Sequence, residues 1–182
     1  MRNSLTALAG ILAIPVVGAP AAGGAPSPGV RATYDGRTVN LAQGWHGAHA
    51  CGVFSPDDVR CFDTRAQLQD AVAIAARTGT AGEAKSAVTA SDCGGSSTEV
   101  QLFSGTNWSG NQLVFVSTSG FYNLADYGFD NDMESWASSK TCNSFVADST
   151  NGGGSILTLG AQSYSLNAGS WKNRASSISV AF

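Results

Sequence analysis

A short acidic segment carries the side chains best suited to metal coordination. Asp130, Asn131, Asp132 and Glu134 place four oxygen-bearing side chains within five residues. Calcium takes its ligands from carboxylates, carbonyl oxygens and water, so the segment is a candidate site for Ca²⁺ as a cofactor. The alternative is that these residues cap turns through side-chain hydrogen bonds and keep a loop in solvent.

Residue patterns for catalysis are weak. The sequence holds neither the G-x-S-x-G pattern of a nucleophile elbow nor the H-E-x-x-H pattern of a zinc helix. His46 and His49 lack a third metal ligand nearby, and the pair Asp57-Asp58 directly follows Pro56, so both pairs are interpreted as turn residues. The sequence therefore predicts that the protein is not an enzyme and has no catalytic residues.

The first 22 residues have the pattern of a secretory signal peptide. Arg2 precedes an apolar run over residues 5–17, and Ala19-Pro20-Ala21 has the spacing of a cleavage site. The run is shorter than the ~20 apolar residues of a membrane span. We therefore expect a secreted, extracellular protein without a membrane span, whose mature chain begins with a flexible arm over residues 23–31. The alternative is a buried N-terminal helix.

Cysteine usage agrees with export. The chain has four cysteines, and an even number in an exported protein indicates two disulfides. Three pairings are open. We favour Cys51–Cys61 with Cys93–Cys142, because each pair lies within one apparent module. The absence of a C-x-x-C pair disfavours a redox site or a zinc ribbon.

Residues 32–78 are predicted to form a small α+β module. Asp35-Gly36 lies between two short strand-like runs and is typical of a tight hairpin turn. A second hairpin is predicted between residues 51–54 and 59–62, where a Cys51–Cys61 disulfide would join the strands.

A helix is predicted to close this module. Thr64 and Gln67 have the spacing of a capping box, and the apolar residues that follow recur at helical intervals: Leu68, Val72, and Ala75 or Ala76. The segment 79–92 is rich in Ala, Gly, Ser and Thr, and is interpreted as a linker.

Residues 93–182 have an all-β pattern that contains an internal repeat. Short apolar runs alternate with Gly, Asn and Ser clusters. Residues 107–115 align with 151–159 at an offset of 44, and residues 129–136 align with 171–178 at an offset of 42. Two matched blocks in the same order predict two copies of one supersecondary unit.

The repeat resembles the Greek keys of βγ-crystallins. The first copy carries that family's aromatic–aromatic–glycine signature, as Phe103-x-x-x-x-Trp108-x-Gly110. Both copies carry segments similar to its calcium motif, which reads Asn/Asp, Asn/Asp, two variable residues, Ser/Thr, Ser: Asp130-Asn131-x-x-Glu134-Ser135 and Lys172-Asn173-x-x-Ser176-Ser177. In the second copy, Ala147 and Gly152 stand where the family has aromatics.

The resemblance implies a mainly β fold: a βγ-crystallin-like double Greek-key sandwich over residues 93–182, preceded by the small α+β hairpin-helix module. Within the superfamily, the chain looks most similar to small secreted bacterial proteins of the metalloproteinase-inhibitor family. In those proteins a cysteine precedes the first strand and another opens the second repeat, and Cys93 and Cys142 fit these places.

The resemblance also implies two calcium sites, each combining ligands from both motifs. One site would hold Asp130, Asn131 and Asp132 with Ser176, and we expect it to bind Ca²⁺ weakly. The other would hold Lys172 and Asn173 with Glu134, where the ammonium group repels a divalent cation and forms a salt bridge with Glu134 instead. At most one calcium site is therefore predicted.

The first functional interpretation is inhibition of extracellular (metallo)peptidases. The candidate loops are residues 104–110, 117–122 and 143–153, with Trp108, Phe121 and Tyr122 as anchors. The alternative for these aromatics is a place in the core. The alternative function is a calcium-binding structural protein of the extracellular space.

The charge of the chain bears on its partners. Only 13% of residues are charged and the net charge is −3, which disfavours a nucleic acid as partner. We expect a monomer whose partner is an extracellular protease.

Overall fold

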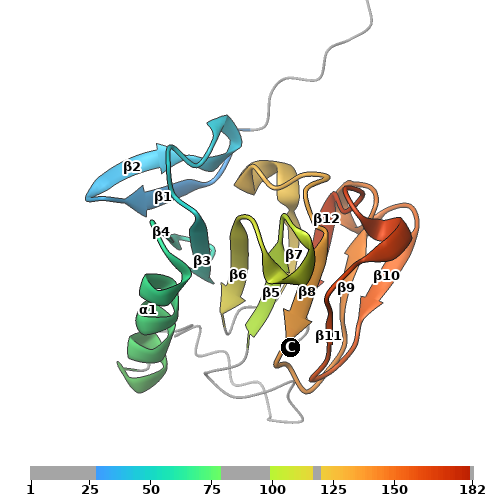
Figure 1. Cartoon of the computed structure of the whole chain (residues 1–182). Helices are drawn as coiled ribbons and strands as arrows, with labels where there is room; N and C mark the ends of the chain where they lie inside the picture. The colour runs from blue at the N-terminus through green and yellow to red at the C-terminus, as the bar shows by residue number, and fades with distance from the viewer. Residues whose placement is uncertain (1–27, 79–98, 117–119, 181–182) are drawn as a thin grey trace, which may run out of the picture.

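The computed structural model describes residues 28–78, 99–116 and 120–180. Within them the chain forms twelve strands and one α-helix, α1 (Arg65–Thr78) (Figure 1). The strands are β1 (Arg31–Tyr34), β2 (Arg37–Asn40), β3 (Ala50–Ser55), β4 (Asp58–Phe62), β5 (Glu99–Phe103), β6 (Gln112–Val116), β7 (Gly120–Asn123), β8 (Ser135–Ser138), β9 (Ser144–Ala147), β10 (Ile156–Leu159), β11 (Tyr164–Ser165) and β12 (Ser177–Val180). The expected signal peptide, the linker 79–92 and Cys93 lie outside the described residues. None of the helical segments described is long and apolar enough to span a membrane.

The N-terminal module has the predicted elements. Asp35 and Gly36 join β1 to β2 with φ values of 49° and 69°, as a type I′ hairpin turn requires. The capping box is also confirmed: the Thr64 N–H donates to Gln67 Oε1 at 3.0 Å, and the Gln67 N–H donates to Thr64 Oγ1 at 3.3 Å. The helix buries the stripe expected from its spacing: Leu68, Val72 and Ala75.

The C-terminal half is a pair of interlocked Greek keys, as predicted. Strands β5–β8 form the first copy and β9–β12 the second. The third strand of each copy joins the sheet of the other: β7 pairs with β12, and β11 pairs with β8. One sheet therefore contains β11-β8-β5-β6, and the other contains β10-β9-β12-β7. This exchange of strands makes a βγ-crystallin-like double Greek key.

The internal repeat is present in the backbone. The 3-10 turn Thr106–Trp108 recurs 44 residues later as Thr150–Gly152. Strand β8 begins at Ser135, and β12 begins 42 residues later at Ser177. These are the two offsets found in the sequence, so the alignment of the copies is confirmed.

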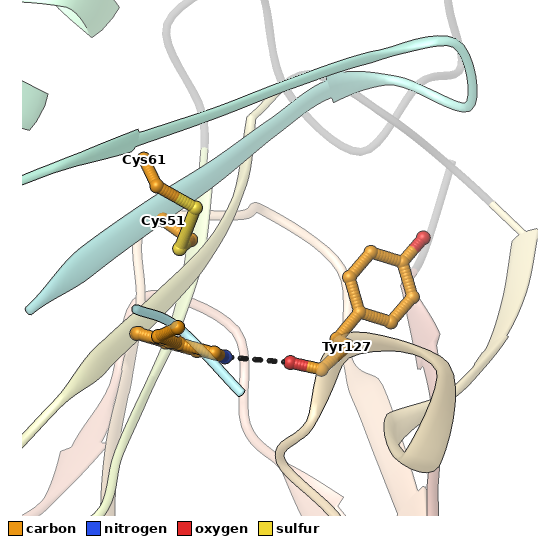
Figure 2. The surroundings of a disulfide bond; sticks show 4 residues. Cys51, Cys61 and Tyr127 are labelled. Atoms are coloured by element: carbon orange, nitrogen blue, oxygen red, sulfur yellow. Dashed lines mark hydrogen bonds between the residues drawn. A yellow bond between two sulfur atoms is a disulfide. The ribbon is translucent and has the colours of Figure 1, made fainter. Parts of the chain in front are cut away.

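The module continues the first Greek-key sheet. Strand β3 runs parallel to β6, with residues 50–53 opposite residues 112–115, which makes one sheet in the order β11-β8-β5-β6-β3-β4-β1-β2. The Cys51–Cys61 disulfide links directly opposed residues of β3 and β4, as predicted (Figure 2). Both sulfur-bearing residues belong to the hydrophobic cluster that also contains the Greek-key core. The two halves therefore share one core.

A second contact joins the halves beside the disulfide. The Trp45 indole Nε1 donates to the Tyr127 carbonyl at 2.7 Å (Figure 2), and the Trp45 and Phe129 rings stack at 5.8 Å. The Val30 N–H donates to the Asp126 carbonyl at 2.8 Å. Val30 lies in the arm expected over residues 23–31, and Arg31 already begins β1. The prediction of a flexible arm is therefore wrong for Val30 and Arg31, because backbone hydrogen bonds hold them, and the Pro28 carbonyl accepts from the Asn40 side chain.

The contact is tightest at Gly128, and substitution there tests it. Gly128 has a φ of 62°, and an added Cβ would lie 2.2 Å from the Leu41 carbonyl oxygen. We expect Gly128→Ala to reduce the free energy of unfolding by about 2–4 kcal/mol, from left-handed strain plus overpacking against backbone. Urea denaturation measures the change.

Gly36→Ala is the matched control, since Gly36 has a φ of 69° with nothing within 4 Å of an added Cβ. It should cost only about 1 kcal/mol, the strain alone. Equal losses in the two variants would show that the packing at Gly128 contributes nothing.

Candidate functional site

The two motifs of the predicted calcium sites lie side by side. The Asn131 N–H donates to the Ala175 carbonyl at 2.8 Å, and the Asn173 N–H donates to the Met133 carbonyl at 3.0 Å. Asn131 and Asn173 both adopt left-handed backbone, with φ values of 54° and 52°. Asparagine tolerates this conformation better than most residues. The reciprocal bonds bring the first half of each motif next to the second half of the other.

The first crossed set has the chemistry of a hard-cation site. Asp130 Oδ2 accepts from Asn131 Nδ2 at 2.9 Å, and Ser176, in the other motif, directly follows the carbonyl that binds the Asn131 N–H. Burial, and then the charge of Glu134, raise the pKa of Asp132. The described residues contain no group of three His, Cys, Asp or Glu side chains placed to hold a metal. Calcium would therefore depend on amide, hydroxyl and backbone oxygens as well as carboxylates, which suits a weak site.

The second crossed set holds an ion pair. Lys172 Nζ lies 3.3 Å from Glu134 Oε2, the pair expected from the sequence. The side chains are 36% and 25% exposed, so the pair stabilises the fold by under about 1 kcal/mol. An ammonium group between the motifs does not fit a divalent cation. That the pair stands in place of a metal stays a prediction.

The last serine of each motif has a structural role. Ser135 Oγ donates to a backbone carbonyl at 2.6 Å and accepts from the Trp108 N–H at 3.1 Å. Ser177 Oγ likewise donates to a carbonyl at 2.6 Å and accepts from the Gly152 N–H at 2.9 Å. Each serine fastens the folded turn of its own copy to the sheet. Each hydroxyl is therefore engaged with the backbone of its own copy.

Of the three aromatic residues predicted as binding anchors, two lie on the surface and one lies in the core. Trp108 is 38% exposed and Phe121 is 65% exposed. Tyr122 is only 9% exposed and packs against the rings of Phe115 and Tyr127. Tyr122 as a binding residue is therefore wrong, because the alternation along β7 points it inward and its neighbour Phe121 outward. Part of the candidate loop 117–122 lies outside the described residues.

Phe121 borders a pocket on the outer face of the second sheet. The pocket has a volume of about 240 Å³, with Phe145 and Ile156 among its lining residues. Phe145 is 40% exposed and Ile156 58% exposed. The rest of the lining consists of small residues, so the three large side chains surround a floor without bulky groups: Ala147, Gly152, Ser177 and Ser179.

Among the described residues, neither the histidines nor Cys142 belong to a group of three metal-binding side chains. His46 and His49 are exposed, and His49 Nδ1 lies 3.2 Å from Asn111 Oδ1. Cys142 is disulfide-bonded, and Cys93, its expected partner, lies outside the described residues.

Sequence reasoning missed a polar groove between α1 and the first Greek key. Its lining includes Gln69, Gln101 and Gln112. Burial raises the pKa of the neighbouring Glu99, against the opposing effect of hydrogen bonds from Gln101 and Gln69. The signal available was the alternation along β5, where Glu99 and Gln101 are polar and Val100 and Leu102 are apolar.

Comparisons with known proteins give a partial likeness. No protein-family model matches the sequence, and no curated protein matches it at a significant level. Among solved structures, a βγ-crystallin from Ciona intestinalis is 22% identical with a TM-score of 0.39, and the match covers 44% of this chain and 96% of that one. A βγ-crystallin domain from Flavobacterium johnsoniae is 24% identical with a TM-score of 0.37, covering 45% of this chain and 93% of that one. The N-terminal domain of protein S is 21% identical with a TM-score of 0.39, and the match covers 46% of this chain and 99% of that one.

Each match spans nearly all of the matched structure but under half of this chain. The fold assignment rests on the strand order and exchange of this chain itself.

Proposed function

We propose that the protein is a secreted, non-catalytic binding protein whose double Greek key holds one weakly bound calcium ion. The observation that carries the proposal is the crossing of the two motifs. It brings Asp130 and Asn131 next to the segment that contains Ser176, and Lys172 next to Glu134. The first set combines carboxylate, amide and hydroxyl oxygens and carries no ammonium group, so we expect this one site of the pair to suit Ca²⁺.

Two features support the extracellular setting. The Cys51–Cys61 disulfide is of the kind that persists in oxidising compartments. The pattern of residues 1–22 is that of a signal peptide. Calcium at the first crossed set would tie the two copies together, since Asp130 belongs to one copy and Ser176 to the other.

Calorimetric titration of CaCl2 into chelator-treated protein tests the calcium site. We expect one ion per chain, and at about 100 times the Kd a stabilisation of about 2.7 kcal/mol in the melting curve. Asp130→Ala should abolish both signals because it removes one of the two carboxylates of an already weak site. Asp57→Ala removes an exposed carboxylate far from the motifs and should leave both unchanged.

Lys172→Asp probes the second set. With the ammonium group replaced by a carboxylate, the stoichiometry should rise from one to two. Two ions bound by the wild-type protein, or calcium stabilisation that survives Asp130→Ala, would contradict the proposal.

Peptidase inhibition is the second candidate, and the exposure of Phe121 favours it. A large aromatic on a rigid, disulfide-linked β framework loses little entropy on binding and can serve as an interface anchor. Phe145 and Ile156 border the same pocket and would extend the contact. The target would be an extracellular metallopeptidase or serine peptidase, bound through the outer face of the second sheet.

Assays against a panel of secreted metallo- and serine peptidases test this candidate. We expect stoichiometric inhibition of at least one enzyme, and a rise in Ki of at least about tenfold for Phe121→Ala. Ile74→Ala is the control, since Ile74 is 53% exposed on α1, outside the pocket. No inhibition across the panel, with the protein itself left intact, would eliminate the candidate.

A further inference from the structure

A groove lies on the outer face of the eight-stranded sheet, beside the part of that face that α1 covers. The helix packs over β3 and β6 through a small apolar cluster that includes Leu68 and Val114. Figure 1 shows α1 beside β3 and β4, away from β8 and β11. The groove beside the helix has a volume of about 380 Å³, and its lining includes Arg65 and Gln69 from α1 and Ala137 from β8.

A row of polar side chains runs along this groove: Gln112 is buried, and Gln101 and Glu99 are half-buried. Gln112 Nε2 donates to Gln101 Oε1 at 2.9 Å, and Gln101 Nε2 donates to Glu99 Oε1. Gln112 lines the groove although it is only 2% exposed. Within the described part of the chain, Gln112 Oε1 is buried and has no hydrogen-bond partner. Buried polar atoms are nearly always paired, so this row calls for donors from a ligand or from water.

The opposite side of the groove is aromatic. Trp108 lines it, and the exposed ring of Tyr164 lies edge-on to the indole at 5.4 Å. Trp108 has a left-handed φ of 58°, whereas the equivalent residue of the second copy is a glycine, Gly152, with a φ of 76°. A bulky residue is strained in this conformation, and such strain is concentrated at functional sites. Arg65 Nη1 donates to the Trp108 carbonyl and holds the loop against α1.

We propose that this groove binds a neutral oligosaccharide. Sugar hydroxyls both donate and accept, so they can satisfy Gln112 Oε1 and the amide row, while the C–H face of a pyranose ring packs on the indole of Trp108. The Arg65 guanidinium is bound to backbone carbonyls, and Glu99 disfavours an anionic ligand. The groove lies on a sheet face and not at an edge, so it offers no strand for an extended peptide to pair with.

The test is calorimetric titration of the full mature protein with cellohexaose, chitohexaose, xylohexaose and maltohexaose, each to about 10 mM. We expect at least one to bind with a Kd below about 1 mM. Trp108→Gly should weaken that binding at least about tenfold while the melting temperature stays equal or rises, because glycine removes the left-handed strain. Gln101→Leu, close in volume to the amide it replaces, should also weaken binding about tenfold because it interrupts the polar row.

Phe121→Ala is the control, since Phe121 is exposed on the other sheet; it should leave the Kd within about twofold. Three results would overturn the proposal. The first is that none of the four glycans saturates the protein. The second is that Trp108→Gly and Gln101→Leu both keep the wild-type Kd although their melting curves show that they are folded. The third is that a decaproline peptide binds at Trp108 while no glycan does, which would make the groove a site for polyproline segments.

Discussion

The parallel pairing of β3 with β6 is the contact on which the rest of the structure depends. It places Cys51 opposite Leu113 and makes the N-terminal module part of the Greek-key sheet. Because side chains alternate along a strand, the same pairing sends Cys51 and Val53 into the common core and Ala50 and Phe54 towards α1. The helix therefore lies beside the first Greek key and forms one side of the polar groove. The disulfide reinforces the strand pair that makes the junction.

The two Greek keys share a backbone but carry different side chains at the positions that matter for binding. Both fasten their folded turns through a serine, Ser135 or Ser177. Beyond that the copies differ: Trp108 lies where the second copy has Gly152, and Lys172 lies where the first has Asp130. The first copy thus contributes Trp108 and an acidic motif, the ion pair joins Glu134 of the first copy to Lys172 of the second, and residues of both copies line the apolar pocket. Duplication provides the scaffold, and these substitutions set what each face can bind.

Local features of the fold were predictable from the sequence. The Asp35-Gly36 turn, the capping box at Thr64 and the repeat offsets depend on residues close in the chain, so propensity and periodicity are sufficient for them. The β3–β6 pairing and the exchange of β7 and β11 could not be predicted, because they join segments far apart in sequence and leave no local pattern. The resemblance to βγ-crystallins supplied the double Greek key, but it says nothing of residues 32–78.

The candidate sites were predictable only in part. The Glu134–Lys172 pair follows from reading the two motifs together, since opposite charges at crossed positions attract. The polar groove was missed because Arg65, Gln101 and Gln112 come from three elements that only the shared sheet brings together. Alternation along β7 places Phe121 and Tyr122 on opposite faces of the sheet. The sequence alone does not say which face is buried, so it could not tell which of the two is exposed.

Differential scanning calorimetry of the mature, disulfide-intact protein tests the central claim most directly. If β3–β6 pairing makes the module and the Greek keys one sheet with one core, heating should give a single transition, with a calorimetric-to-van't Hoff enthalpy ratio of about 1. Two separable transitions, or a ratio well above 1, would show that the module unfolds independently and would contradict the account.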